Sequence, residues 1–275
     1  MKNNPISATL RYFVLGLLAL VTVMPLAWAV LASLRPPTES FASGNVWFGS
    51  HLSLESFRTA FEIAPFGRYY LNTLMQVALI LSMQFLTSSL AAFAFARWRF
   101  WGDKALFTIV LVQMMIPFAA LLVGNFQTVS GLGLYDTILG IGLPFFGSAF
   151  GTFLLRQSFL EIPADFTDAA EIDGCRWDQV LRLVYLPNST SALAAFALSS
   201  FSWHWNDFLW PLVVTQSESV RPITTGLARF TQMGEIGAQW SLLAAATLIV
   251  AFPLFLLFVL FRKQFLEGYL NSGIK

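Results

Sequence analysis

One charged segment has the residue types and spacing for binding a partner through paired charges. Residues 156–182 carry nine charged side chains, whereas the apolar stretches on either side carry none. Within it, the run from Asp168 through Glu171 and Asp173 to Gly174 alternates carboxylates with small residues. Small residues let a second surface approach closely, and carboxylates can pair with its cations. The segment is therefore predicted to lie in water and to present a short helix to a groove on a partner.

The same segment predicts two short helices separated by a glycine. Pro163 suits the first turn of a helix, and Phe166, Ala169 and Ala170 then fall at i, i+3 and i+4, which predicts one small apolar face. Gly174 interrupts the pattern, as a glycine just past a helix end does. A second helical pattern follows and closes at Leu186-Pro187; its apolar positions are Trp177, Val180, Leu181 and Val184.

Uncharged polar side chains inside apolar stretches form a second set of candidates. In hydrocarbon such groups need hydrogen-bond partners, and in a water-filled route they can bind the hydroxyl groups of a solute. Hydrogen bonding between helices explains each of them equally well. The candidates for a substrate pathway are Asn72, Gln76, Gln113, Asn125, Trp205, Asn206 and Asp207, with Gln84 and Gln127 of the same kind.

The run from Trp205 to Trp210 combines aromatic faces with an amide and a carboxylate. This combination suits a sugar, whose C–H faces stack on rings while its hydroxyls form hydrogen bonds. The run also lies near the predicted outer end of an apolar stretch, where tryptophans form interfacial belts. Both interpretations stay open at this point.

Signatures of catalysis and metal binding are missing from the sequence. It contains no G-x-x-x-x-G-K-[ST] phosphate loop, no H-E-x-x-H and no G-x-S-x-G. The two histidines, His51 and His204, are far apart, and the one cysteine, Cys175, cannot form an internal disulfide. His204 lies between two tryptophans and is expected to be a packed or interfacial residue. We expect no metal site, no cofactor on this chain and no catalysis by it.

The elements that must position these residues follow from composition. Of the 275 residues, 56% are hydrophobic and only 11% are charged, which excludes an ordinary soluble globule. Lys and Arg number 16 against 15 Asp and Glu, so no basic field exists to hold a nucleic acid. The expected fold is an all-α, polytopic membrane protein.

Six apolar stretches are long enough to cross a bilayer, which needs about 20 helical residues. The run Phe208–Val214 is too short to cross and is expected to be interfacial or re-entrant, and the first stretch is expected to be retained rather than cleaved. The predicted spans are roughly 12–34, 69–96, 105–129, 137–155, 186–206 and 237–261, with a cytoplasmic loop at 156–185.

The positions of Lys and Arg predict the orientation of these spans. With the N-terminus inside, the inner segments hold eleven Lys and Arg and the outer segments five. Positive charge favours the cytoplasmic side, so both termini are expected there.

A resemblance carries the interpretation further. Asp168 to Gly174, followed nine residues later by Val184-Tyr-Leu-Pro187, resembles the EAA motif of membrane subunits of binding-protein-dependent ABC importers. The departures from the motif are Asp168 for Glu, Cys175 for Ala, Val184 for Ile and Ser191 for a second proline. Further segments are similar to the sugar-type, maltose MalG-like group: 69–73, 97–102, 153–157, 205–208 and 268–275.

The resemblance implies a MetI-like ABC permease fold, with 1–275 as a single transmembrane permease domain. It implies a second permease subunit, expected to be a different chain although a homodimer stays open, two ATPase subunits that bind ATP and Mg, and an extracytoplasmic solute-binding protein. It places the chain in the bacterial inner membrane and implies a carbohydrate or related solute, such as a polyol, a glycerol-linked compound or a sugar acid. The residues implied in coupling to the ATPase are Asp168, Ala169, Ala170, Glu171, Asp173, Gly174, Trp177, Leu186 and Pro187.

Two other classes of protein remain as alternatives. A stand-alone secondary carrier or channel would also be polytopic, but it would have no need of a docking helix between Pro163 and Pro187. A membrane-embedded enzyme is disfavoured by the missing catalytic clusters.

Overall fold

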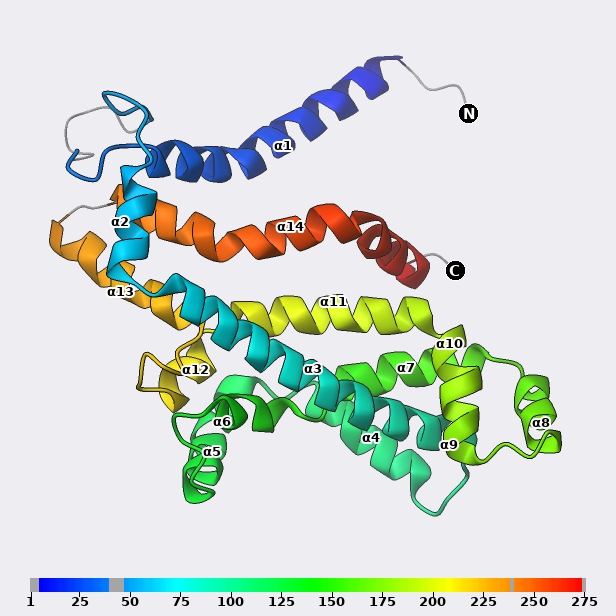
Figure 1. The fold of residues 1–275 in the computed structure, drawn as a ribbon. Coiled ribbons are helices and arrows are strands. Elements are labelled where there is room, and N and C mark those ends of the chain that lie inside the picture. The colour runs from blue at the N-terminus through cyan, green and yellow to red at the C-terminus, as the bar shows by residue number, and fades with distance from the viewer. Residues whose placement is uncertain (1–4, 40–46, 238–239, 274–275) are drawn as a thin grey trace. The chain divides into compact units, whose positions relative to one another are not determined.

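A computed structural model describes residues 5–39, 47–237 and 240–273, and this part of the chain contains helices and no strand. The chain divides into two compact units, Met1–Phe66 with Gly226–Pro253, and Gly67–Thr225 with Leu254–Lys275 (Figure 1). The helices are α1 Pro5–Ser33, α2 Glu55–Ile63, α3 Phe66–Arg97, α4 Asp103–Gln113, α5 Phe118–Gly131, α6 Ile138–Gly142, η2 Leu143–Phe145, α7 Ala149–Glu161, α8 Ala164–Ile172, α9 Trp177–Val180, η3 Leu181–Tyr185, α10 Leu186–Asn188, α11 Thr190–Asn206, α12 Leu209–Val214, α13 Ile223–Gly237 and α14 Trp240–Gly273.

The first unit combines an exposed apolar helix with a small aromatic core. No residue in the most apolar window of α1 is buried, as expected of a helix that faces lipid. Phe66 stacks on Phe230 at 5.6 Å between ring centres and meets Phe61 edge-on at 5.4 Å. These rings bring α2, the start of α3 and α13 together.

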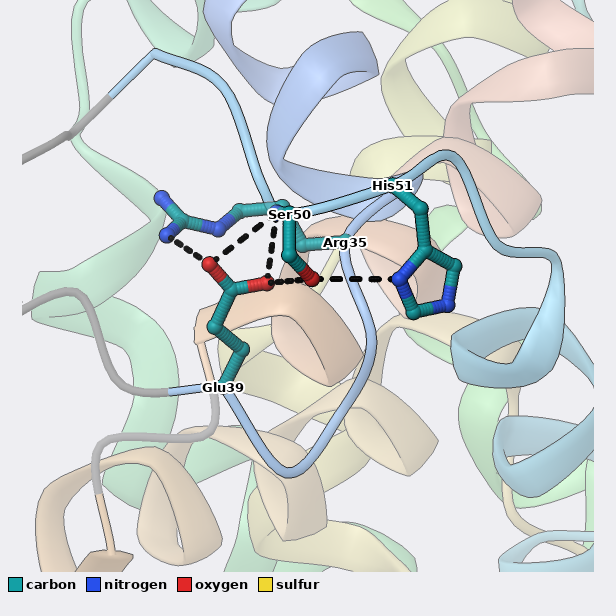
Figure 2. Close-up of polar contacts among 4 residues, drawn as sticks. All are labelled: Arg35, Glu39, Ser50 and His51. Atoms are coloured by element: carbon teal, nitrogen blue, oxygen red, sulfur yellow. Dashed lines mark hydrogen bonds and ion pairs between the residues drawn. The ribbon is translucent and has the colours of Figure 1, made fainter.

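A polar cluster lies after α1 in the first unit and consists of Arg35, Glu39, Ser50 and His51. The Glu39 carboxylate accepts hydrogen bonds from Arg35 Nη2 at 3.1 Å and from the Ser50 N–H at 3.0 Å, and the Ser50 hydroxyl lies 3.1 Å from His51 Nδ1 (Figure 2). The Ser50 backbone N–H and the nearby Arg35 hold the pKa of Glu39 below its ordinary value. Polar contacts therefore join residues 35 and 39 to residues 50 and 51.

The second unit is organised around α3. Figure 1 shows α3 running along α7 and α11, with α9, α10 and α8 towards one end of this group. Gly151 of α7 lies so close to α11 that an added Cβ would stand 2.4 Å from the buried Phe196 ring, whereas a Cβ on Gly147 would meet nothing within 4 Å. Gly151 therefore permits a close approach of two helices.

Three helices are long and apolar enough to cross a membrane by themselves: Leu10–Ser33 in α1, Phe66–Arg97 and Trp240–Phe261 in α14. They agree with the first, second and last predicted spans. Two bent pairs raise the number of candidate spans to five. The count of six and the positions of the termini stay predictions.

The segment 105–129 is predicted as one span, but the structure divides it between two helices. α4 and α5 meet at an angle of 100°. The break falls at Met114–Pro117, where Pro117 has extended backbone (φ −62°, ψ 133°) and no N–H to continue the ladder of hydrogen bonds. The prediction of 105–129 as one apolar stretch did not take Pro117 into account.

The predicted fourth and fifth spans, 137–155 and 186–206, are also interrupted. The helices α6–η2 and α7 meet at 49°, where Ser148 caps α7 by accepting the Gly151 N–H. In the fifth, α10 and α11 are separated at Ser189, and α11 has 17 residues. The short run Phe208–Val214 contains the six-residue helix α12, and its interfacial or re-entrant placement stays a prediction.

Candidate functional site

The segment from α8 to α10 folds as helix, glycine turn and helix, as its sequence predicts. α8 follows Pro163 and ends at Ile172, with Asp173 as its cap, and Gly174 has φ +81°, a conformation that favours glycine. The N–H groups of Asp173, Gly174 and Cys175 donate to the carbonyl groups of residues 169, 171 and 170, which closes the end of the helix.

The apolar face predicted for α8 is only in part the face that packs on the rest of the chain. The buried residues are Thr167 and Ala170, whereas Phe166 is 55% exposed and Ala169 is exposed. The Thr167 hydroxyl accepts a hydrogen bond from Arg97 and shares one with the Tyr185 hydroxyl. These polar contacts set the rotation of α8, which an apolar pattern alone could not reveal.

The second helical pattern is confirmed at its centre. Val180, Leu181 and Tyr185 are buried, and Tyr185 lies edge-on to Phe93 of α3 at 5.1 Å and to Phe159 of α7 at 5.2 Å. Val184 and Leu186 pack at the margin of this cluster.

The two ends of the second pattern differ more from the prediction. Trp177 is about half exposed and meets Trp98 edge-on at 6.0 Å. Pro187 does not close the helix, because α10 continues to Asn188 and the break comes at Ser189. A proline in the first turn of a helical segment has no N–H that needs a partner there, so it is tolerated.

The outward face of α8 carries carboxylates beside apolar side chains. Asp168, Ala169, Glu171, Asp173 and Gly174 are all exposed. Ile172 is 85% exposed on the same short helix as the exposed Phe166. Within the described part of the chain, none of these three carboxylates forms an ion pair. A short helix with apolar side chains and unpaired negative charges has the chemistry of a docking surface.

The substrate-pathway candidates do not form one cluster in this chain. Asn72 is buried and its Nδ2 donates to the carbonyl groups of Ser219 and Arg221 at 3.0 and 2.9 Å. Asp207 accepts the Trp210 N–H at 3.5 Å, and its own carbonyl accepts the Thr224 hydroxyl at 2.6 Å. Both side chains therefore hold backbone at the same end of the second unit.

The other candidates are spread over α3, α4, α5 and α11. Gln76 is buried, with Nε2 3.5 Å from the His204 carbonyl oxygen. Gln113 is exposed on α4 and Asn125 half-buried on α5, on either side of the 100° break. Trp205 is 1% exposed and the side chain of Asn206 is exposed, donating to the Ser202 carbonyl group. A buried indole offers no open face to a sugar or to lipid, so neither interpretation of Trp205 is favoured by its position in this chain.

A buried polar network between α3 and α11 is more extensive than the sequence suggested. The Gln84 Nε2 donates to the Phe145 carbonyl group at 2.9 Å and lies 3.3 Å from His204 Nε2, while its Oε1 accepts from the Ser200 hydroxyl. An amide nitrogen can only donate, so His204 Nε2 is the acceptor in this contact. His204 is buried and packs on the Phe145 ring at 4.7 Å, as its predicted packed role requires. The spacing of Ser200 and His204, four residues apart on one helix face, was the signal for this network.

A loop clamp at Asp136 was missed by sequence reasoning. Asp136 has φ +57°, and its Oδ1 accepts the N–H groups of Gln216 at 2.8 Å and Ser217 at 3.0 Å. Burial raises the pKa of Asp136. The hydrogen bonds and the charge of Arg221 together lower this pKa by more, so it lies below the ordinary value. Arg68 Nε donates to the Ser219 carbonyl group in the same segment.

These helices define an integral membrane protein of the all-α class, and comparison identifies the family. Residues 84–265 match the family described as the inner membrane component of binding-protein-dependent transport systems, and the chain belongs to this family. The resemblance of its EAA-like segment to such subunits agrees with this assignment.

Curated relatives extend over the whole chain. It is 32% identical to the arabinooligosaccharides transport system permease protein AraQ of Halalkalibacterium halodurans, covering 100% of this chain and 99% of that protein. It is 30% identical to the lactose transport system permease protein LacG of Rhizobium radiobacter, covering 95% and 94%. It is 27% identical to the sn-glycerol-3-phosphate transport system permease protein UgpE of Brucella abortus, covering 99% of each.

Solved structures share the fold. A chain of a bacterial ABC transporter involved in the import of the acidic polysaccharide alginate matches with a TM-score of 0.84, 21% identity and coverage of 96% and 98%. A chain of an alginate ABC transporter in complex with its pentasaccharide-bound periplasmic protein matches with a TM-score of 0.67, 18% identity and coverage of 93% and 94%.

Proposed function

We propose that this chain is one of two permease subunits of an ABC importer and that α8 docks on an ATPase subunit. The observation that carries the proposal is the outward face of α8, where exposed carboxylates and apolar side chains lie without ion pairs among the described residues. In a chain of this transport family, such a helix supplies the contact through which a separate ATPase can act. The chain itself hydrolyses nothing, and ATP and Mg bind to the ATPase.

The docking works through shape and charge. Small side chains at Ala169 and Gly174 let α8 enter a groove, and Asp168, Glu171 and Asp173 pair with cationic residues on its walls. Closure of the ATPase subunits then displaces α8 and shifts the permease between its inward-open and outward-open states. The size of the shift is limited by the difference in nucleotide affinity between the two states.

The solute is a carbohydrate or a related hydroxylated compound. The named relatives transport arabino-oligosaccharides, lactose and sn-glycerol-3-phosphate, which are all rich in hydroxyl groups. The candidates Asn72, Gln76, Gln113, Asn125, Asn206 and Asp207 offer amide and carboxylate groups that can hydrogen-bond with hydroxyls. The contacts of Asn72 and Gln76 with their own chain mean that these two would bind solute only after α3 moves.

The assembly contains a second permease, two ATPase subunits and an extracytoplasmic solute-binding protein, and it lies in the bacterial inner membrane. A periplasmic binding protein accompanies the alginate transporter that shares this fold, which supports such a partner here. The second permease is proposed to be a different chain, and purification of the assembled transporter distinguishes this arrangement from a homodimer.

Cross-linking tests the docking helix directly. In a Cys175→Ala background, Asp168→Cys should form a disulfide with cysteines placed along the groove of the ATPase subunit. Arg58→Cys is the control, because its side chain is exposed on α2 in a predicted extracytoplasmic loop and should not react with the same cysteines. Failure of Asp168→Cys at every groove position would refute the docking.

Reconstitution separates the proposal from its main alternative. The complete transporter in proteoliposomes should take up solute only with ATP and the loaded binding protein. Uptake by the purified subunit alone, without nucleotide, would show a stand-alone carrier or channel instead.

A further inference from the structure

Arg97, the last residue of α3, connects this helix to α8. Its Nη2 donates a hydrogen bond to Thr167 Oγ1, and its guanidinium carbon lies 5.2 Å from the centre of the Tyr185 ring. The hydroxyl groups of Thr167 and Tyr185 share a hydrogen bond of 2.7 Å. We name these three residues the α3–α8 joint.

The joint is largely shielded from water. Thr167 and Tyr185 are buried and Arg97 is half-buried. The Tyr185 ring is fixed from two sides by Phe93 and Phe159. Hydrogen bonds that involve a charged group are stronger than neutral ones, and a guanidinium over an aromatic face adds an attraction of its own. The joint therefore resists separation of α3 from α8.

The other attachments of α8 are of a different kind. The chain links α8 to α7 through Ile162-Pro163 and to α9 through residues 174–176. Ala170 is the second buried residue of α8 and packs in an apolar cluster, where attraction depends on area and has little direction. The joint is the directional contact that ties α8 to a helix 70 residues away in the sequence.

Along its length, α3 forms hydrogen bonds with segments that would have to move during transport. Thr87 Oγ1 donates to the Phe146 carbonyl group at 2.7 Å and Ser88 Oγ to that of Ser148 at 3.3 Å, both at the break before α7. Nearer its other end, Asn72 holds the carbonyl groups of Ser219 and Arg221. A displacement of the Arg97 end of α3 would reach both places, because a helix is a stiff element.

We propose that Arg97 is a positioning residue for transport, which transfers the displacement of α8 to α3. The inference rests on the proposed function, because an ATPase must move α8. Without the joint, α8 still docks and the ATPase still closes, but α3 follows less completely. The signature is therefore a loss of coupling, and not a loss of assembly.

The experiment measures solute uptake per ATP hydrolysed by the complete transporter in proteoliposomes. Arg97→Ala should lower this ratio about tenfold and Thr167→Val about threefold, since each variant removes a hydrogen bond within the joint. Thr167→Ser keeps the hydroxyl and should restore the ratio, whereas Arg97→Lys keeps only a point charge and should restore it in part. Arg99→Ala is the matched control. The Arg99 side chain is 89% exposed, and its ion pair with Asp103, at 3.8 Å, lies at the surface and contributes little.

The Asp168→Cys cross-link is measured in each variant and distinguishes the two levels of the proposal. A lowered ratio with a preserved cross-link and normal assembly supports the joint. A ratio equal to that of Arg99→Ala, with the cross-link preserved, overturns the joint and leaves the proposed function standing. Absence of the cross-link in the otherwise unmodified transporter overturns the proposed function. Should Arg97→Ala fail to assemble, Thr167→Val against Thr167→Ser decides by the same ratio.

Discussion

Two polar regions at the two ends of α3 use hydrogen bonds in different ways. Near its start, Asn72 joins Asp136 in holding backbone groups of segment 215–222. At its other end, Arg97 bonds to side chains, and α8 beyond it presents carboxylates that have no ion pair among the described residues. The first region bonds its polar side chains to backbone groups of the same chain. The second leaves three exposed carboxylates without an ion pair in the part of the chain that the structure describes, which is the arrangement that the proposed docking requires.

The largest expected effect is at the turn of the α8 region. Gly174→Val places a β-branched residue at φ +81°, which costs about 1–3 kcal/mol and distorts the end of α8. Solute uptake by the complete transporter should fall by about tenfold or more. Gly102→Val is the matched control, because Gly102 has φ +84° and, like Gly174, open space around it, but lies outside α8. Equal uptake by the two variants would remove the special role of the α8 turn.

The next effect is on stability and comes from a tight contact at Gly140 of α6, four residues after Asp136 in the sequence. A Cβ added to Gly140 would lie 2.1 Å from the Leu134 carbonyl oxygen, so Gly140→Ala forces the backbone to shift and should lower the free energy of unfolding by about 1–3 kcal/mol. Gly124→Ala, in open space on α5, should leave that free energy unchanged or raise it. Thermal unfolding of the detergent-purified protein measures both. An unchanged midpoint for Gly140→Ala would contradict the close approach of Gly140 to the Leu134 carbonyl group.

A pair of alanine variants tests the contrast itself. Asp168→Ala should lower uptake by a few fold, on the order of one surface ion pair, without changing the unfolding midpoint. Asp136→Ala should lower the free energy of unfolding by about 1–2 kcal/mol. The variant loses two hydrogen bonds and places alanine at φ +57°, a backbone conformation that alanine tolerates poorly. The same effect of both variants on both measurements would show that the two regions do not differ.

The smallest effect is the dependence of stability on pH. The folded pKa of Asp136 lies below its ordinary value of 3.8, so its contribution to stability is present above 3.8 and is lost as the pH falls through the lower folded value. Unfolding midpoints measured from pH 6 downwards should therefore fall less steeply in Asp136→Asn than in the unmodified protein. Parallel curves would mean that the clamp does not depend on the charge.

Much of the fold follows from local patterns in the sequence. The long apolar runs predicted α1, α3 and α14, and Pro163 and Gly174 marked the two ends of α8. The 100° break between α4 and α5 was not predicted, because hydrophobic periodicity does not report the angle at which two helices meet at a proline. Family membership was also within reach of the sequence, through the spacing of the motif around Gly174.

The candidate site was predicted in composition but not in orientation. The carboxylates of α8 are exposed as their pattern suggested, but the apolar pattern did not indicate that Thr167 is buried with Ala170. The pathway candidates Asn72 and Gln76 turned out to hold backbone of their own chain, which depends on residues about 130 to 150 positions away. No local pattern contains that information.

The sequence by itself determined that this protein is a helical membrane component and that one charged, alanine-rich helix stands apart from its apolar spans, because these properties are local in the chain. The tertiary structure decided which side of that helix is left free and which residue ties it to α3. Both depend on Arg97, Thr167 and Tyr185 meeting, and a contact between residues 97, 167 and 185 is set by the packing of three separate elements.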